Sequence, residues 1–150
     1  MNISLDWIFS FLTGIFLIPC TIFDIRNKGI SKRYLVIAMI VVLATEGILI
    51  IKEERSITDL FIDIMPGIFL LLITGITKGK MGAGDGIVFL ILGLMIGYFP
   101  ALMVMTAALF LSGIYGGYLM LFKKASRTHT IPWMPFVLMA YWVWWITKQG

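Results

Sequence analysis

The sequence predicts an all-α membrane protein, a single domain over residues 1–150 that forms a bundle of six transmembrane helices. Apolar residues make up 60% of the 150 positions and charged residues 13%, whereas an average soluble domain has roughly 45–50% and about 25%. A folded chain this short cannot hide so many apolar side chains from water, so they must face lipid. One span takes about 20 residues, and six spans take about 120, which leaves no length for a soluble domain.

Six apolar runs are the predicted helices, in order along the chain. They cover residues 3–22, 34–51, 57–77, 86–99, 101–122 and 132–147. The fourth run is short, because about fourteen residues reach about 21 Å while the hydrocarbon layer is about 30 Å thick. We expect this helix to start below the membrane surface or to include part of the glycine-rich segment before it.

The basic residues predict the orientation, since lysine and arginine stay on the cytoplasmic side when loops are short. Nine of the twelve lie in the first, third and fifth connections: Arg26, Lys28, Lys32, Arg33, Lys78, Lys80, Lys123, Lys124 and Arg127. The others are Lys52, Arg55 and Lys148, two of them beside Glu53 and Glu54. We therefore expect both termini outside and the basic loops against anionic lipid.

Nucleic acid is not expected as a partner, because these basic residues are spread over three loops rather than gathered in one groove. A single cysteine, Cys20, excludes a disulfide framework and a multi-cysteine zinc site. The only histidine, His129, lies in the fifth connection, where an interfacial role is expected. No metal and no cofactor is predicted.

Eight acidic residues remain to be explained. Solvation accounts for Asp6, Glu53 and Glu54 near the outer side. Ser56 and Asp59 have the spacing of a capping box at the start of the third helix. Glu46 and Asp63 lie a turn or more inside their helices, where protonation, pairing with each other or solvation through a thin membrane stay open. An alternative function that would use these two acids, a small proton-coupled carrier or channel subunit, also stays open.

Asp24 and Asp85 are the two acids left, and both are expected at the cytoplasmic side. Asp24 ends the first helix, and Asp85 follows Gly82-Ala83-Gly84. These glycines, with Gly86, remove side-chain bulk, so a substrate backbone can approach the carboxylate.

Two facing carboxylates can hydrolyse a peptide bond. One pKa rises and the other falls, so one group takes a proton from water and the other polarises the carbonyl. We therefore predict Asp24 and Asp85 as catalytic residues and Gly82, Ala83, Gly84 and Gly86 as substrate-binding residues.

Three segments resemble the type IV prepilin peptidases, membrane aspartic proteases with a Gly-x-Gly-Asp motif. The segments are Asp24-Ile25-Arg26-Asn27-Lys28-Gly29-Ile30, Gly82-Ala83-Gly84-Asp85 with Gly93 and Gly97 after it, and Ile131-Pro132-Trp133-Met134-Pro135-Phe136. The resemblance implies the Asp24–Asp85 dyad, a prokaryotic cell-membrane location with the active site toward the cytoplasm, and a prepilin or pseudopilin substrate whose leader is removed.

The sequence departs from the family pattern at two places. Ser31 stands where a proline is usual, and Ile87 where a lysine is frequent. The larger members carry an N-terminal methyltransferase domain with paired cysteines, so this chain resembles the minimal, protease-only members. The two departures leave a catalytically idle pilus-assembly factor as an alternative.

Overall fold

The computed structural model describes residues 3–77, 82–122 and 131–149. These residues form seven helices and contain no strand. The helices are α1 (Ile3–Asn27), α2 (Lys32–Ile51), α3 (Ile57–Asp63), α4 (Met65–Ile76), α5 (Ala83–Ile96), α6 (Tyr98–Phe122) and α7 (Met134–Gln149). The all-α prediction is confirmed. Each of the six apolar runs corresponds to helix, and the third run is divided between α3 and α4.

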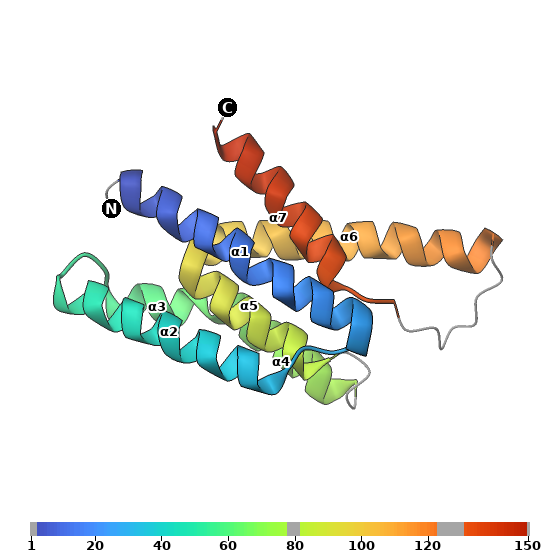
Figure 1. Cartoon of the computed structure of the whole chain (residues 1–150), viewed down its shortest axis with the longest axis horizontal. Coiled ribbons are helices and arrows are strands. Elements are labelled where there is room, and N and C mark those ends of the chain that lie inside the picture. The colour runs from blue at the N-terminus through green and yellow to red at the C-terminus, as the bar shows by residue number, and fades with distance from the viewer. Residues whose placement is uncertain (1–2, 78–81, 123–130, 150) are drawn as a thin grey trace.

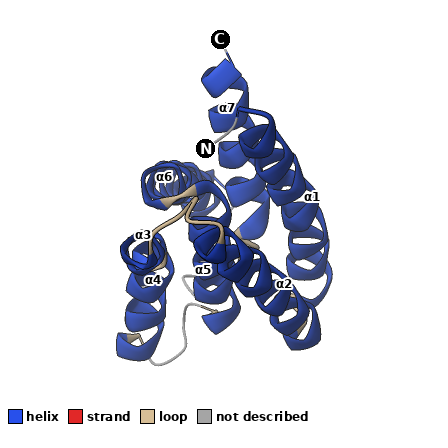
Figure 2. Cartoon of the chain, turned by 90° about the vertical axis from the view of Figure 1, so that its left-hand side faces the viewer, coloured by secondary structure: helices blue, strands red, loops and turns tan. Residues whose placement is uncertain are grey.

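Helix α5 forms the centre of the bundle. It packs against α1, α2, α3, α4 and α6, and Figure 2 shows it between α4 and α2. Val88, Phe89, Ile91 and Leu92 of this helix are fully buried. Helix α7 packs against α1 and α6, while the C-terminal end of α6 extends away from the other helices (Figure 1). The hydrophobic core therefore forms around α5, which corresponds to the shortest of the six predicted spans.

The break between α3 and α4 lies at Ile64. Pro66 is in the first turn of α4, where a proline is tolerated because its missing N–H would lack a helical partner anyway. At its start, α3 has the predicted capping box, with Ser56 accepting from the N–H of Thr58 and Asp59 accepting from the N–H of Ser56. The predicted role of Asp59 in capping α3 is thus confirmed.

Within the part of the chain that the structure describes, four segments are long and apolar enough to cross a membrane: Phe9–Asn27, Lys32–Ile51, Ile57–Ile76 and Tyr98–Phe122. Helix α5 is apolar but shorter, as expected for the fourth run. It ends at Gly97, whose φ of 90° is a backbone conformation that favours glycine. The chain is thus a membrane protein in which a short central helix packs among longer apolar segments.

Glycines allow α5 to lie very close to α3 and α4. A β-carbon on Gly93 would be 1.9 Å from the carbonyl oxygen of Asp63, and one on Gly67 would be 2.4 Å from the nitrogen of Leu90. Two pairs of glycines, Gly93 with Gly97 and Gly113 with Gly117, have the small-xxx-small spacing that predicts close helix approach. The prediction is confirmed at Gly93 and wrong for Gly113 and Gly117, which have nothing within 4 Å among the described residues.

Candidate active site

Asp24 lies at the C-terminal end of α1 and is 7% exposed. The helix ends because Lys28 adopts a left-handed φ of 51°, with its N–H donating to the carbonyl of Asp24 at 2.9 Å. The carboxylate Oδ2 of Asp24 accepts a hydrogen bond from the backbone N–H of Met134 at 2.9 Å. Since Met134 begins α7, the partial positive end of that helix faces Asp24. Helices α1 and α7, which are far apart in the sequence, therefore meet at this carboxylate.

Asp85 lies in the first turn of α5 and is partly buried. Gly82 precedes the helix in an extended conformation, and the N–H of Asp85 donates to the carbonyl of Gly82 at 3.0 Å. A carboxylate in the first turn complements the helix dipole. The glycine segment therefore ends where the helix begins, and it presents Asp85 at the rim of the bundle.

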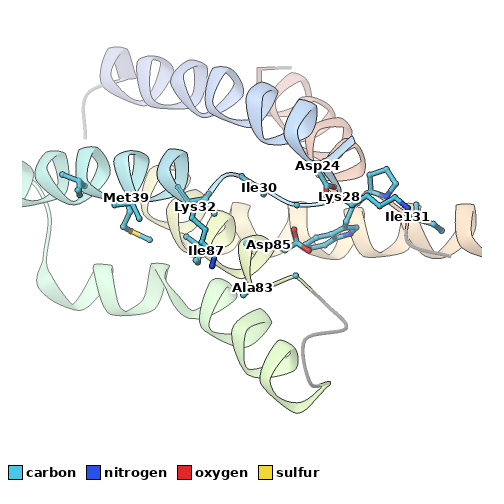
Figure 3. A pocket seen from close by; sticks show the side chains of 17 residues that line it. Asp24, Lys28, Ile30, Lys32, Met39, Ala83, Asp85, Ile87 and Ile131 are labelled. Atoms are coloured by element: carbon cyan, nitrogen blue, oxygen red, sulfur yellow. The ribbon is translucent and has the colours of Figure 1, made fainter. Parts of the chain in front are cut away.

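The two aspartates line one cavity of about 800 Å³. Figure 3 shows them on neighbouring walls, Asp24 from α1 and Asp85 from α5. The remaining walls come from the α1–α2 connection, one face of α2 and the segment before α7. The lining residues besides the aspartates are Lys28, Gly29, Ile30, Lys32, Leu35, Val36, Met39, Ile40, Gly82, Ala83, Gly84, Ile87, Ile131, Pro132 and Trp133.

Three of the four predicted substrate-binding residues, Gly82, Ala83 and Gly84, are in this lining. A β-carbon on Gly84 would make ordinary contacts with Ile30 and Leu35. The fourth residue, Gly86, is buried and does not line the cavity.

A β-carbon on Gly86 would be 2.6 Å from Cδ2 of Leu71. We therefore correct its assignment. Gly86 allows α4 to pack closely on α5, because it lies one residue beyond Asp85 and points to another side of the helix.

The structure adds residues that the sequence reasoning did not place in the site. Met134 contributes a backbone N–H, and such a donor leaves no signal in a side-chain pattern. Trp133 lines the cavity and stacks on Phe89 with ring centroids 5.4 Å apart. On α2, the spacing of Lys32, Val36 and Ile40 on one helical face was available as a signal. Without the position of α5, that face could not be related to Asp85.

Glu46 and Asp63 are found at the opposite end of α5, bound to the same arginine. Both nitrogens at the tip of the Arg55 guanidinium are used, one donating to Glu46 Oε1 and the other to Asp63 Oδ2. The first also donates to the carbonyl oxygen of Leu94 at 2.9 Å. Glu46 and Asp63 are thus joined through Arg55, which we had treated as a loop residue that reports orientation. We refer to Arg55, Glu46 and Asp63 as the outer ion cluster, after the side of the membrane on which the basic residues predict them to lie.

Asp63 has a second hydrogen bond, from the backbone N–H of Tyr98 to its Oδ1 at 2.6 Å. In an uninterrupted helix that N–H would donate to the carbonyl of Leu94. At the carbonyl of Leu94, the guanidinium of Arg55 replaces the N–H of Tyr98 as the hydrogen-bond donor. The outer ion cluster therefore satisfies backbone groups at the α5–α6 junction in addition to joining α2, α3 and α5.

Comparison with known proteins identifies one family. The sequence model of the type IV leader peptidase family matches residues 11–117, a range that includes Asp24 and Asp85 and ends before the segment at residues 131–136. No curated protein and no solved structure matches the chain.

Proposed function

The chain belongs to the type IV leader peptidase family, and from this premise we propose that it is an aspartic endopeptidase that uses Asp24 and Asp85 to remove the leader peptide of a prepilin or pseudopilin. The observation that carries the proposal is that both carboxylates line the same cavity of about 800 Å³. Asp24 and Asp85 are 61 residues apart in the sequence. This cavity is large enough to hold a stretch of peptide together with water.

We assign the general base to Asp24 and the general acid to Asp85. The N–H of Met134 donates to the carboxylate of Asp24 and orients it, so we give Asp24 the role of proton acceptor. Asp85 then holds the proton that two neighbouring carboxyl groups share.

In the reaction, Asp24 takes a proton from a water molecule while the oxygen of that water bonds to the scissile carbonyl carbon. Asp85 donates its proton to the carbonyl oxygen. The carbon–nitrogen bond then breaks as Asp24 passes the proton taken from water to the leaving amine, and a hydroxyl on the tetrahedral carbon returns a proton to Asp85.

The substrate fits the expected orientation of the bundle. Asp24 and Asp85 lie at the ends of α1 and α5 that adjoin the basic first and third connections, the side we assign to the cytoplasm. A substrate with a short charged leader and a following apolar helix would place the bond between them at this boundary. The enzyme and its substrate would thus both be anchored in the same prokaryotic cell membrane.

Cleavage assays on dyad variants test this proposal. Purified wild type, Asp24→Asn and Asp85→Asn are incubated in detergent with candidate prepilins, and the products are followed by mass. Loss of either carboxyl group should lower the cleavage rate by about 10²–10⁴-fold, because each takes part in proton transfer. Asp59→Asn is the matched control, because Asp59 caps α3 at the opposite end of the bundle. Undiminished cleavage by both dyad variants would refute the assignment.

The two alternatives make different predictions in the same experiment. An idle assembly factor would cleave no pilin-like substrate in any variant. A proton-coupled carrier would depend on Glu46 and Asp63, but both carboxylates are bound to Arg55 and buried at the outer end of α5. That arrangement favours a structural role for these two acids, and it leaves the cavity beside Asp85 as the site of chemistry.

A further inference from the structure

We propose that one face of α2 binds the apolar segment of the substrate that follows the cut bond. This inference rests on the proposed function. The face is formed by Val36, Met39 and Ile40, with Ile87 of α5 beside it, and we call these four residues the α2 trough. All four line the same cavity as Asp24 and Asp85. The trough is therefore a continuation of the candidate active site and not a separate pocket.

The trough runs along the helix away from the aspartates. Lys32 begins α2 at the mouth of the cavity, and Ile40 lies eight residues further on, which is about 12 Å at 1.5 Å per residue. In Figure 3, Lys32 and Ile87 lie side by side, and Met39 is at the end of the cavity away from Asp24. A peptide would fill this length with about four extended residues or eight helical ones.

The walls of the trough determine which part of the substrate it can hold. All four of its residues are apolar. Of the charged residues that line the cavity, Asp24, Asp85 and Lys28 lie toward the other end, and Lys32 lies between them and Met39 (Figure 3). A polar leader would lose its hydration in the trough without gaining a partner. An apolar segment would instead bury its side chains there. Because the cut bond must lie at the aspartates, the apolar side of the substrate is the part that reaches the trough.

Helix α2 leaves this face uncovered. Its main packing partner is α5, and Val36 and Ile40 are 58% and 61% exposed. A transmembrane substrate can therefore reach the trough from within the lipid, without first entering the bundle. Lipid acyl chains have the same apolar chemistry, so the experiment must distinguish peptide from lipid at this surface.

Ile37 offers a matched control for Ile40. It lies on the same helix, is 62% exposed and is not part of the cavity lining. Substitutions at positions 37 and 40 should have similar effects on folding and membrane insertion. A difference between the two positions in substrate binding or cleavage would then be caused by the trough.

Binding is tested first, without cleavage. Ile40→Cys and Ile37→Cys are each introduced with Asp85→Asn, and the probe is a synthetic peptide with a charged leader and a 20-residue apolar segment. A single cysteine is moved through the first ten apolar positions of the peptide, and disulfide formation is measured. We expect cross-links from position 40 to a continuous set of positions, and few from position 37. Equal cross-linking, or none from position 40, would overturn the proposal and leave only lipid on this face.

Kinetics then test whether the trough selects substrates. Ile40→Trp should lower kcat/KM about tenfold for the peptide with the long apolar segment, since a large side chain in an apolar subsite removes contacts of that magnitude. A peptide that ends two residues after the cut bond does not reach position 40, so its kcat/KM should fall less than that of the long peptide. Ile37→Trp should leave both rates unchanged, and equal rates for Ile40→Trp and wild type on the long peptide would refute the inference.

Failure of the proposed function would look different. If wild type cleaves neither peptide while position 40 still cross-links to the apolar segment, the peptidase reaction is wrong and the docking surface stands. If wild type cleaves both peptides and position 40 gives no cross-link, the reaction stands and the docking surface is wrong.

Discussion

Replacing Arg55 with methionine is expected to destabilise the protein strongly, although Arg55 lies far from the proposed catalytic residues. The substitution keeps an unbranched apolar stem and removes the guanidinium with its charge. It leaves the carboxylates of Glu46 and Asp63, 2% and 6% exposed, without the cation that joins them. Removing one partner of a buried ion pair costs about 3–5 kcal/mol, because the remaining charge is neither solvated nor paired.

The same substitution also removes the donor to the carbonyl of Leu94. An unsatisfied buried carbonyl costs a further amount of about 1–3 kcal/mol. Arg55→Lys should lie between wild type and Arg55→Met, because an ammonium keeps the charge and lacks the fork that reaches both carboxylates. The free energy of unfolding in mixed micelles, from denaturant titration followed by circular dichroism, measures each effect.

A rescue variant tests the cause. Adding Glu46→Gln and Asp63→Asn to Arg55→Met removes the two stranded charges and should recover most of the lost stability. Lys52→Met, in the same connection but exposed, should change stability by less than about 0.5 kcal/mol. If Arg55→Met is within about 1 kcal/mol of wild type, or if the rescue variant is no more stable than Arg55→Met, the reasoning from the outer ion cluster is wrong.

Two further predictions concern packing and orientation. Gly93→Ala should lower the free energy of unfolding by about 2–3 kcal/mol, because the new methyl group overlaps the carbonyl of Asp63 and the helices must separate; Gly117→Ala, with open space around it, should stay within about 0.5 kcal/mol. Equal effects at the two glycines would contradict the packing. Reporter fusions after Lys28 and after Lys124 should both report the cytoplasm, and opposite sides would exclude six spans.

The sequence was sufficient for the helices and for the two aspartates because those signals are local. Apolar runs mark helices wherever lipid is the solvent. Asp85 follows three small residues that a simple helix cap would not need. The proximity of Asp24 and Asp85 could not be predicted from local signals, since three helices, α2, α3 and α4, lie between them in the chain. The resemblance to a family bridged that gap, and the structure brings both residues to one cavity.

Arg55 shows where local reasoning fails. In the sequence it stands next to two glutamates in a connection, and those neighbours suggest a solvated loop. Its partners are nine and eight residues away, on two helices that reach it only after the connection has turned. Gly86 fails for the opposite reason. It is adjacent to Asp85 in the sequence, but one residue along a helix is about 100° of rotation, enough to turn it from the cavity to α4.

The hydrogen bond between Met134 and Asp24 joins residues 110 positions apart, and this separation has a consequence for synthesis. A ribosome makes α1 well before α7, so Asp24 is synthesised long before its backbone donor Met134 and before the wall formed by residues 131–133. While α2 to α6 are being inserted, the cavity that holds Asp24 and Asp85 is therefore still incomplete. It is complete only once the segment that begins α7 has been made.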